Sequence, residues 1–169
     1  DGAGVAILSA TEEDRGVLST HLHSEGEHAQ QLWVDAPASG EMPRLTPEIL
    51  NEGRHYLQMN GREVFRHAVT RFPEVIMEGL EANKLQISDV DLLIPHQANI
   101  RISQFIQKKL GLKNEQVMSN IHKYGNTTAA SVPIALAEAI RENRISKGDV
   151  VVLAAFGSGF AWASAIIKW

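Results

Sequence analysis

The chain has 169 residues, of which 44% are hydrophobic and 21% charged, a composition typical of one globular domain. Its formal net charge of −4 argues against a general affinity for nucleic acid or for anionic membranes. The sequence contains no cysteine, which excludes a disulfide framework, a thiolate zinc site and a catalytic thiol within these residues. The longest apolar run, residues 150–156, is far too short to span a membrane.

The first fifty residues favour β structure followed by a loop. Residues 4–9 form a short apolar run and residues 17–23 alternate weakly, so both predict strands. Residues 35–48 contain three prolines and a Ser-Gly pair, which together predict a loop.

The hydrophobic period changes after residue 60. Apolar residues recur at three- and four-residue spacing through residues 60–80, which predicts a helix that Pro73 should kink or divide. Further elements are predicted at residues 90–95 (strand), 97–110 (helix), 127–141 (helix), 149–156 (strand) and 161–168 (strand).

Apolar strands that alternate with helices indicate an α/β sheet between helix layers. The last two strands are separated only by residues 157–160, a turn built on Gly157, Ser158 and Gly159 that is short enough that they must pair antiparallel. The predicted fold class is therefore α/β with a mixed sheet.

His96 is the first candidate for chemistry. It directly follows the strand at residues 90–95, and catalytic groups of α/β folds gather at the carboxyl ends of strands. An imidazole at a helix N-terminus tends to be held neutral, as a hydrogen-bond donor or as a base. Taken alone, His96 could equally be a helix-capping or core histidine.

Asn126 is the second candidate. It follows Gly125 and leads into small residues at the start of a helix, where its amide could donate to an oxyanion or could simply cap the helix. Considered together, the two residues favour a catalytic role over a structural one, because His96 and Asn126 could donate two hydrogen bonds to one developing enolate oxygen.

Three motifs carry these residues in a fixed order: Ile94-Pro95-His96-Gln97-Ala98-Asn99-Ile100-Arg101-Ile102, Tyr124-Gly125-Asn126-Thr127-Thr128-Ala129-Ala130-Ser131-Val132-Pro133 and Phe156-Gly157-Ser158-Gly159-Phe160-Ala161-Trp162. Together they resemble β-ketoacyl-acyl-carrier-protein synthase III, a thiolase-fold family of condensing enzymes that starts fatty-acid synthesis. Three motifs in the family's order and spacing are far more specific than any one of them. The resemblance covers essentially the whole chain.

The resemblance implies a thiolase-like fold in two halves. Residues 1–50 match the end of the N-terminal half plus a connecting loop, and residues 51–169 match the C-terminal half. The family's nucleophilic cysteine belongs to the N-terminal half, upstream of Asp1. We therefore expect this chain to be the C-terminal half of a longer synthase, to lack most of the N-terminal half, and to be inactive alone.

The activity implied by the resemblance is acyl transfer in lipid metabolism, a decarboxylative Claisen condensation of an acyl-coenzyme A primer with malonyl-acyl carrier protein. His96 and Asn126 match the residues that hold the malonyl thioester carbonyl. The backbone N–H of Ser158 matches one donor of the acyl oxyanion hole. Many family members have glycine at this position, and serine keeps the N–H but restricts φ.

The resemblance also implies surfaces for the two substrates. The matched positions along the substrate and coenzyme A channel are Gly61, Phe65, Asn99, Arg101 and Phe156. Those of the carrier-protein docking patch are Arg66, Arg101, Lys108 and Lys109. Residues 93–123 carry a net charge of +4 on an acidic chain, which suits an acidic partner, although a solvated helix face is the simpler explanation of charge alone. The implied enzyme is a cytoplasmic homodimer that needs no cofactor and no metal.

Other interpretations were weighed. A metal site from His21, His23 and His28 has no obvious fourth ligand. A dinucleotide site fails because the 157–159 turn lies between two strands and no helix follows. A noncatalytic thiolase-fold partner subunit or an inactive fragment fits a cysteine-free chain, but a partner has no need to retain both His96 and Asn126. A later-stage synthase or a thiolase is also disfavoured, because later-stage synthases typically place two histidines at the site.

Overall fold

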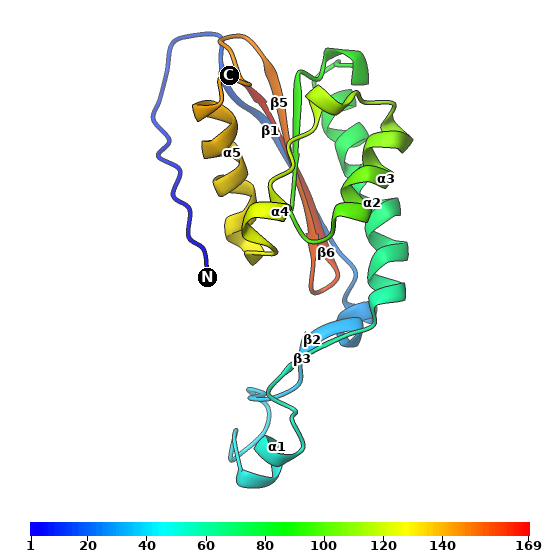
Figure 1. The fold of residues 1–169 in the computed structure, drawn as a ribbon. Coiled ribbons are helices and arrows are strands. Elements are labelled where there is room, and N and C mark those ends of the chain that lie inside the picture. The colour runs from blue at the N-terminus through cyan, green and yellow to red at the C-terminus, as the bar shows by residue number, and fades with distance from the viewer.

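A four-stranded mixed sheet forms the centre of the computed structural model, which describes residues 1–169 (Figure 1). Its strands are β1 (Gly16–Ser24), β4 (Leu92–Pro95), β5 (Val150–Gly157) and β6 (Ala161–Lys168), in the order β1-β6-β5-β4. The β4–β5 pair is parallel, whereas β5–β6 and β6–β1 are antiparallel. The predicted mixed α/β sheet is therefore confirmed.

Helices cover both faces of this sheet (Figure 1). The helices are α1 (Pro47–Asn51), α2 (Gly61–Ala82), α3 (Ile100–Leu110), α4 (Ile121–Tyr124) and α5 (Ser131–Arg141). Short 3-10 turns lie at Gly26–Gln31, Ile87–Asp89, Asn114–Gln116 and Thr128–Ala130. A second, two-stranded antiparallel sheet, β2 (Leu32–Val34) with β3 (Leu57–Met59), forms an arm that projects from the sheet and carries α1 at its tip. No helix is both long and apolar enough to cross a membrane.

The core is divided into two layers by the sheet. Phe72, Ile76 and Leu80 of α2 pack with α3 against one face, and Ala135 and Ala139 of α5 pack against the other. Neighbouring residues of β5 serve opposite layers: Val151 belongs to the α5 layer and Val152 to the α2 layer. Because both faces are covered, β5 needs a continuous apolar sequence rather than an alternating one.

Pro73 does not divide α2, so the part of the prediction that allowed a division is wrong. The helix runs without interruption from Gly61 to Ala82, with Pro73 buried inside it. Proline lacks the N–H that would bond the carbonyl of Val69, four residues earlier. The ammonium of Lys109 on α3 lies 3.4 Å from that carbonyl oxygen and donates to it, so the neighbouring helix partners the group that proline leaves free.

The predicted strand at residues 4–9 is also wrong. Residues 1–10 have no secondary structure and all are exposed, including Val5 (88%) and Ile7 (92%). The segment runs beside α5, where Gly4 lies close to Pro133 (Figure 1). An apolar run supplies side chains for a strand but not the neighbouring strand that its backbone N–H and C=O groups require.

Gly79 lies where α2 packs against β6. A Cβ at this position would lie 2.9 Å from Cδ1 of Ile166 and 3.1 Å from Oγ of Ser164. Alanine usually stabilises a helix interior by about 1 kcal/mol relative to glycine. Here we expect Gly79→Ala to lower the free energy of unfolding by about 1–3 kcal/mol, because the fully buried Ile166 has no room to move.

Urea unfolding measures this effect. Gly26→Ala is the matched control, since a Cβ at Gly26 meets no atom within 4 Å. An unfolding free energy that rises for Gly79→Ala would contradict the close helix–sheet contact.

Candidate active site

His96 lies at the edge of the sheet where the parallel strands β4 and β5 both end. Pro95 pairs with Ala154, and the backbone N–H of His96 donates to the Ala154 carbonyl at 2.8 Å. The imidazole is half-buried, and burial lowers the pKa of His96 below its usual value, which favours the neutral ring. The expected neutral state agrees with this shift, but its cause is desolvation, since α3 begins only at Ile100.

A buried serine holds the His96 ring. Nδ1 of His96 lies 2.6 Å from Oγ of Ser131, the first residue of α5. The same hydroxyl oxygen accepts a hydrogen bond from the backbone N–H of Gln97 at 3.1 Å. Nε2 of His96 makes no hydrogen bond within the chain, so one ring nitrogen is fixed and the other is unused.

Asn126 lies in the exposed loop between α4 and α5. Its side-chain oxygen accepts from the backbone N–H of Thr128 at 2.9 Å, which fixes the orientation of the amide. The amide nitrogen makes no hydrogen bond within the chain and is free to donate. Asn126 does not cap α5, which begins after Ala130, because a 3-10 turn intervenes.

Ser158 lies in the exposed turn between β5 and β6, which the Gly157–Ala161 pair closes. Its φ is not positive, whereas Gly159 has φ 138°. The left-handed region is therefore needed at Gly159 and not at Ser158, so a serine fits here without strain. Phe156 precedes the turn and is buried in the core, with its ring 4.9 Å from that of Phe160.

The remaining matched positions lie at the start of α2 and along α3. Gly61 is the first residue of α2, and Phe65 meets Phe105 of α3 edge-on at 6.2 Å. Asn99 caps α3 by accepting from the backbone N–H of Arg101 at 2.9 Å, which explains why this helix begins later than predicted.

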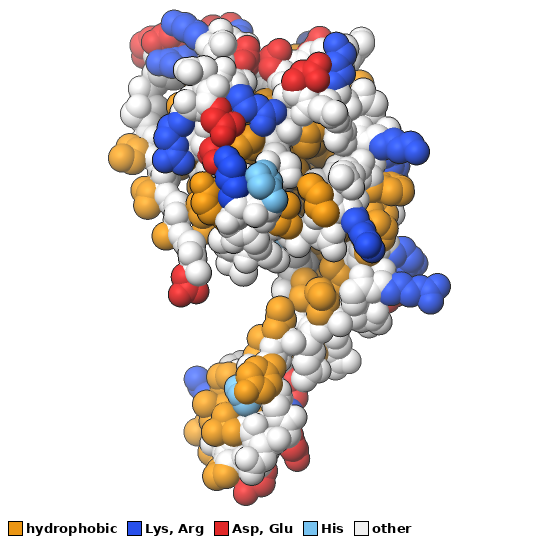
Figure 2. All heavy atoms as spheres, in the orientation of Figure 1, with side chains coloured by type: hydrophobic (Ala, Val, Ile, Leu, Met, Phe, Trp, Pro, Cys, Tyr) orange, Lys and Arg blue, Asp and Glu red, His pale blue; other side chains and the backbone are white.

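Basic side chains gather on the side of the molecule formed by α2 and α3 (Figure 2). Arg101, Lys108 and Lys109 are exposed on α3. Arg66 on α2 is exposed too, but it donates to Glu63 at 2.5 Å, which neutralises part of its charge. Arg101 and Lys108 make no ion pair with any residue of the chain, so their charge is directed to solvent.

The alternative metal site from His21, His23 and His28 is not formed. His21 and His23 both contact the carboxylate of Glu78, at 3.2 and 2.6 Å, and thereby tie β1 to α2. His28 lies instead beside His67, with the ring centroids 4.2 Å apart.

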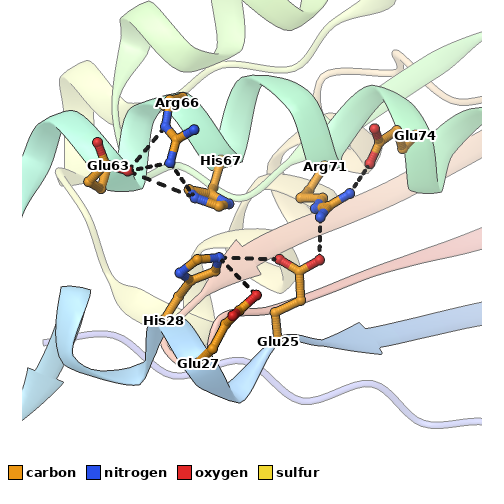
Figure 3. A network of polar contacts seen from close by, with 8 residues as sticks. All are labelled: Glu25, Glu27, His28, Glu63, Arg66, His67, Arg71 and Glu74. Atoms are coloured by element: carbon orange, nitrogen blue, oxygen red, sulfur yellow. Dashed lines mark hydrogen bonds and ion pairs between the residues drawn. The ribbon is translucent and has the colours of Figure 1, made fainter.

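A different trio could hold a metal ion. The ligand atoms of Glu25, His28 and His67 lie within 4.8 Å of one another (Figure 3). The guanidinium of Arg71 already binds the Glu25 carboxylate, and its positive charge opposes a cation at this position.

A buried polar network supports both candidate loops. The side chain of Gln97 donates to the carbonyls of Pro95 and Met118 and accepts from the backbone N–H of Asn120 at 3.1 Å. Asn120 in turn donates to Glu138 of α5 at 2.8 Å. The sequence patterns above do not predict this network or a role for Ser131, although polar residues within apolar segments are a signal for it.

Two hollows of the surface lie away from His96, Asn126 and Ser158. One cavity of about 380 Å³ lies at the opposite end of the sheet, where Lys147, Lys168 and Trp169 are among its lining residues. Another of about 200 Å³ lies beside α2 and is lined by Arg66, His67, Thr70 and Arg71. Neither includes His96, Asn126 or Ser158.

Known proteins resemble the chain in both sequence and fold. Residues 80–169 match the profile of the family described as 3-oxoacyl-[acyl-carrier-protein (ACP)] synthase III C terminal. The β-ketoacyl-[acyl-carrier-protein] synthases III of Roseiflexus castenholzii and Clostridioides difficile are 46% and 44% identical over 169 residues, and the chain covers 51% of each. The synthase III structure from Thermus thermophilus matches with a TM-score of 0.85 and 37% identity, over 96% of this chain and 49% of that one. The structure from Aquifex aeolicus matches with a TM-score of 0.83 and 36% identity, over 95% and 47%.

The molecule therefore has the mixed α/β architecture of one half of a thiolase-type fold, as the sequence predicted. The chain belongs to the 3-oxoacyl-[acyl-carrier-protein] synthase III C-terminal family. It spans about half the length of the curated relatives that it matches.

Glu138 offers a test of the network behind the site. Its carboxylate accepts from Lys123 at 2.6 Å, Asn120 at 2.8 Å and Tyr124 at 3.3 Å, and the Lys123 ammonium holds the pKa of Glu138 below its usual value. We expect Glu138→Gln to lower the free energy of unfolding by about 1–3 kcal/mol near neutral pH, since hydrogen bonds to a buried charge are lost.

This difference depends on pH in a defined direction. A carboxyl whose pKa is lowered by folding stabilises the protein above its unfolded pKa, and this contribution is lost as pH falls through the folded pKa. The difference in unfolding free energy between the unaltered chain and Glu138→Gln should therefore shrink in acid when unfolding is measured at several pH values. Glu81→Gln, at an exposed glutamate that forms no ion pair, is the control, and a gap that stays constant into acid would contradict the charged role of Glu138.

Proposed function

We propose that this chain is the C-terminal half of a 3-oxoacyl-[acyl-carrier-protein] synthase III, an acyltransferase of fatty-acid synthesis. The enzyme condenses an acyl-coenzyme A primer with malonyl-acyl carrier protein and releases carbon dioxide. One observation carries the proposal: His96 and Asn126 are each oriented by a hydrogen bond that leaves a nitrogen unused. Membership of the family supports the same function.

The proposed chemistry needs two hydrogen-bond donors at one oxygen. When the malonyl thioester loses carbon dioxide, the electron pair of the broken C–C bond passes into an enolate, and negative charge develops on the thioester oxygen. Nε2 of His96 and the amide nitrogen of Asn126 would donate to that oxygen and lower the barrier. A neutral imidazole suits this role, because its N–H donates a hydrogen bond and keeps its proton instead of transferring it to the substrate.

The second half of the reaction requires a nucleophile that this chain does not contain. A cysteine in the rest of the enzyme would carry the acyl group, and the carbanion would attack its carbonyl carbon. The carbonyl electrons would move to an oxyanion held by backbone N–H groups, that of Ser158 among them, and then return to expel the cysteine thiolate. The product is a β-ketoacyl thioester, and no cofactor or metal takes part.

The proposed substrate channel and docking patch lie on neighbouring elements. Gly61, Phe65, Asn99, Arg101 and Phe156 would line or support the channel for the acyl-coenzyme A primer. The exposed charges of α3, Arg101 and Lys108 above all, would steer the acidic carrier protein. Neither of the two cavities described above contains His96 and Asn126, which fits a pocket completed by the other half of the enzyme. A cytoplasmic homodimer is part of the same proposal.

Substitution of the two donors should separate the half-reactions. In the complete synthase, we expect His96→Ala and Asn126→Ala each to slow malonyl decarboxylation by about 10²–10³-fold, because each removes a donor to the developing oxyanion. Acyl transfer from coenzyme A to the cysteine should fall much less. Release of labelled carbon dioxide and acylation observed by intact mass measure the two steps.

His122→Ala is the matched control, since His122 is exposed on α4 and makes no hydrogen bond. Equal losses in both half-reactions would show that the assigned roles are wrong.

Charge reversal on α3 tests the docking patch. Arg101→Glu combined with Lys108→Glu should raise KM for malonyl-acyl carrier protein about tenfold or more, because like charges then oppose the encounter. At saturating acyl-coenzyme A, whose channel Arg101 would also line, activity with a short malonyl thioester that lacks the protein should be nearly unchanged. The control reverses two other exposed charges, Lys84→Glu with Arg141→Glu, and an equal loss on both substrates would remove the docking role.

A further inference from the structure

A neutral imidazole carries its single proton on one of two nitrogens, and only one tautomer of His96 leaves a donor at Nε2. The role of His96 in decarboxylation rests on the proposed function. Its tautomer does not, because it is a property of the contacts around the ring in this chain.

The contacts of Ser131 distinguish the tautomers. Its hydroxyl has one hydrogen to donate and two lone pairs to accept. The backbone N–H of Gln97, which is always a donor, uses one lone pair at 3.1 Å. The other partner of this oxygen is Nδ1 of His96 at 2.6 Å, and no other acceptor contacts it.

The two tautomers therefore differ in how many groups they satisfy. If Nδ1 carried the proton, the serine oxygen would accept two N–H groups and its own hydrogen would have no acceptor, although Ser131 is only 2% exposed. If Nδ1 is bare, the hydroxyl donates to it and the buried serine is fully paired, and only the Nε2–H of the half-buried His96 ring has no acceptor within the chain. A buried donor without an acceptor is costly, so the second arrangement is favoured.

The position of Ser131 supports a role outside its own helix. A serine at the start of a helix usually caps it by accepting from the backbone. Ser131 is the first residue of α5, one position past the N-cap residue Ala130, which supplies no side-chain bond. The hydroxyl of Ser131 is directed across to the loop after β4, whose Gln97 is anchored by three further hydrogen bonds.

We propose that Ser131 is a positioning residue that donates to Nδ1 of His96 and holds the neutral ring in the tautomer with its proton on Nε2. The segment that bears Asn126 thereby also orients the other proposed donor, His96. Ser131 lies five residues beyond Asn126, so a displacement of this segment would disturb both donors together.

Nitrogen NMR of the chain labelled with ¹⁵N at its histidines tests the proposal without any catalysis. We expect the ¹⁵N shifts of His96 to show a protonated Nε2 and a bare Nδ1 at neutral pH. In Ser131→Ala the shifts should move toward the other tautomer or a mixture, and Ser131→Thr, which keeps the hydroxyl, should restore them. Ser103→Ala, at a buried serine of α3, should leave them unchanged. Amide spectra and urea unfolding establish that each variant is folded.

A proton on Nδ1 in the unaltered chain, or shifts that do not respond to Ser131→Ala, would overturn the proposal. Decarboxylation by the complete synthase is the separate readout of function. We expect Ser131→Ala to slow it about tenfold, the effect of one hydrogen bond, and Ser131→Thr to recover it. If Ser131→Ala changes the tautomer but not the decarboxylation rate, the role assigned to His96 is wrong. The control of its tautomer by Ser131 would still hold.

Discussion

The parallel pairing of β4 with β5 is the constraint on which the rest of the structure depends. It brings the carboxyl ends of both strands to one edge, so that His96 and the turn at Ser158 lie at the same end of the sheet although they are far apart in sequence. Both strands are covered by helices on each face, which is why their sequences are apolar throughout. His96 and the turn at Ser158 are thus placed by backbone hydrogen bonds and held there by burial.

Polar groups inside this apolar frame decide the finer geometry. Gln97, Asn120 and Glu138 form a buried chain that joins the loop after β4 to α5. Each member is paired, because an unpaired polar group would be costly at that depth. Ser131 likewise provides a buried hydrogen-bond partner for the imidazole of His96. If His96 and Asn126 are the two donors proposed above, their fixed orientation is what electrostatic stabilisation of an oxyanion requires.

Sequence patterns predicted the sheet, its mixed pairing and the main helices, because hydrophobic period reports which face of an element is buried. The same patterns failed where the outcome depends on a distant partner. Residues 4–9 lack a neighbouring strand, and the carbonyl left free by Pro73 is bonded by Lys109 from another helix. His96 and Asn126 were predicted as site residues from their positions and motifs, and that prediction stands untested, whereas Ser131 was not predicted because a serine at a helix start has an ordinary local explanation. The trio of Glu25, His28 and His67 depends on the packing of α2, which no spacing in the sequence reveals.

The exposed segment at residues 4–9 has a consequence for the colloidal behaviour of the chain. From Gly2 to Thr11 the sequence has no charged residue and no proline, and its backbone groups are unpaired in the fold. Such a segment is a template for intermolecular β pairing, the first step toward aggregates with cross-β order. Because it lies outside the core, strengthening the core does not protect it. Self-association of the chain can therefore begin at these residues even where the folded domain is stable.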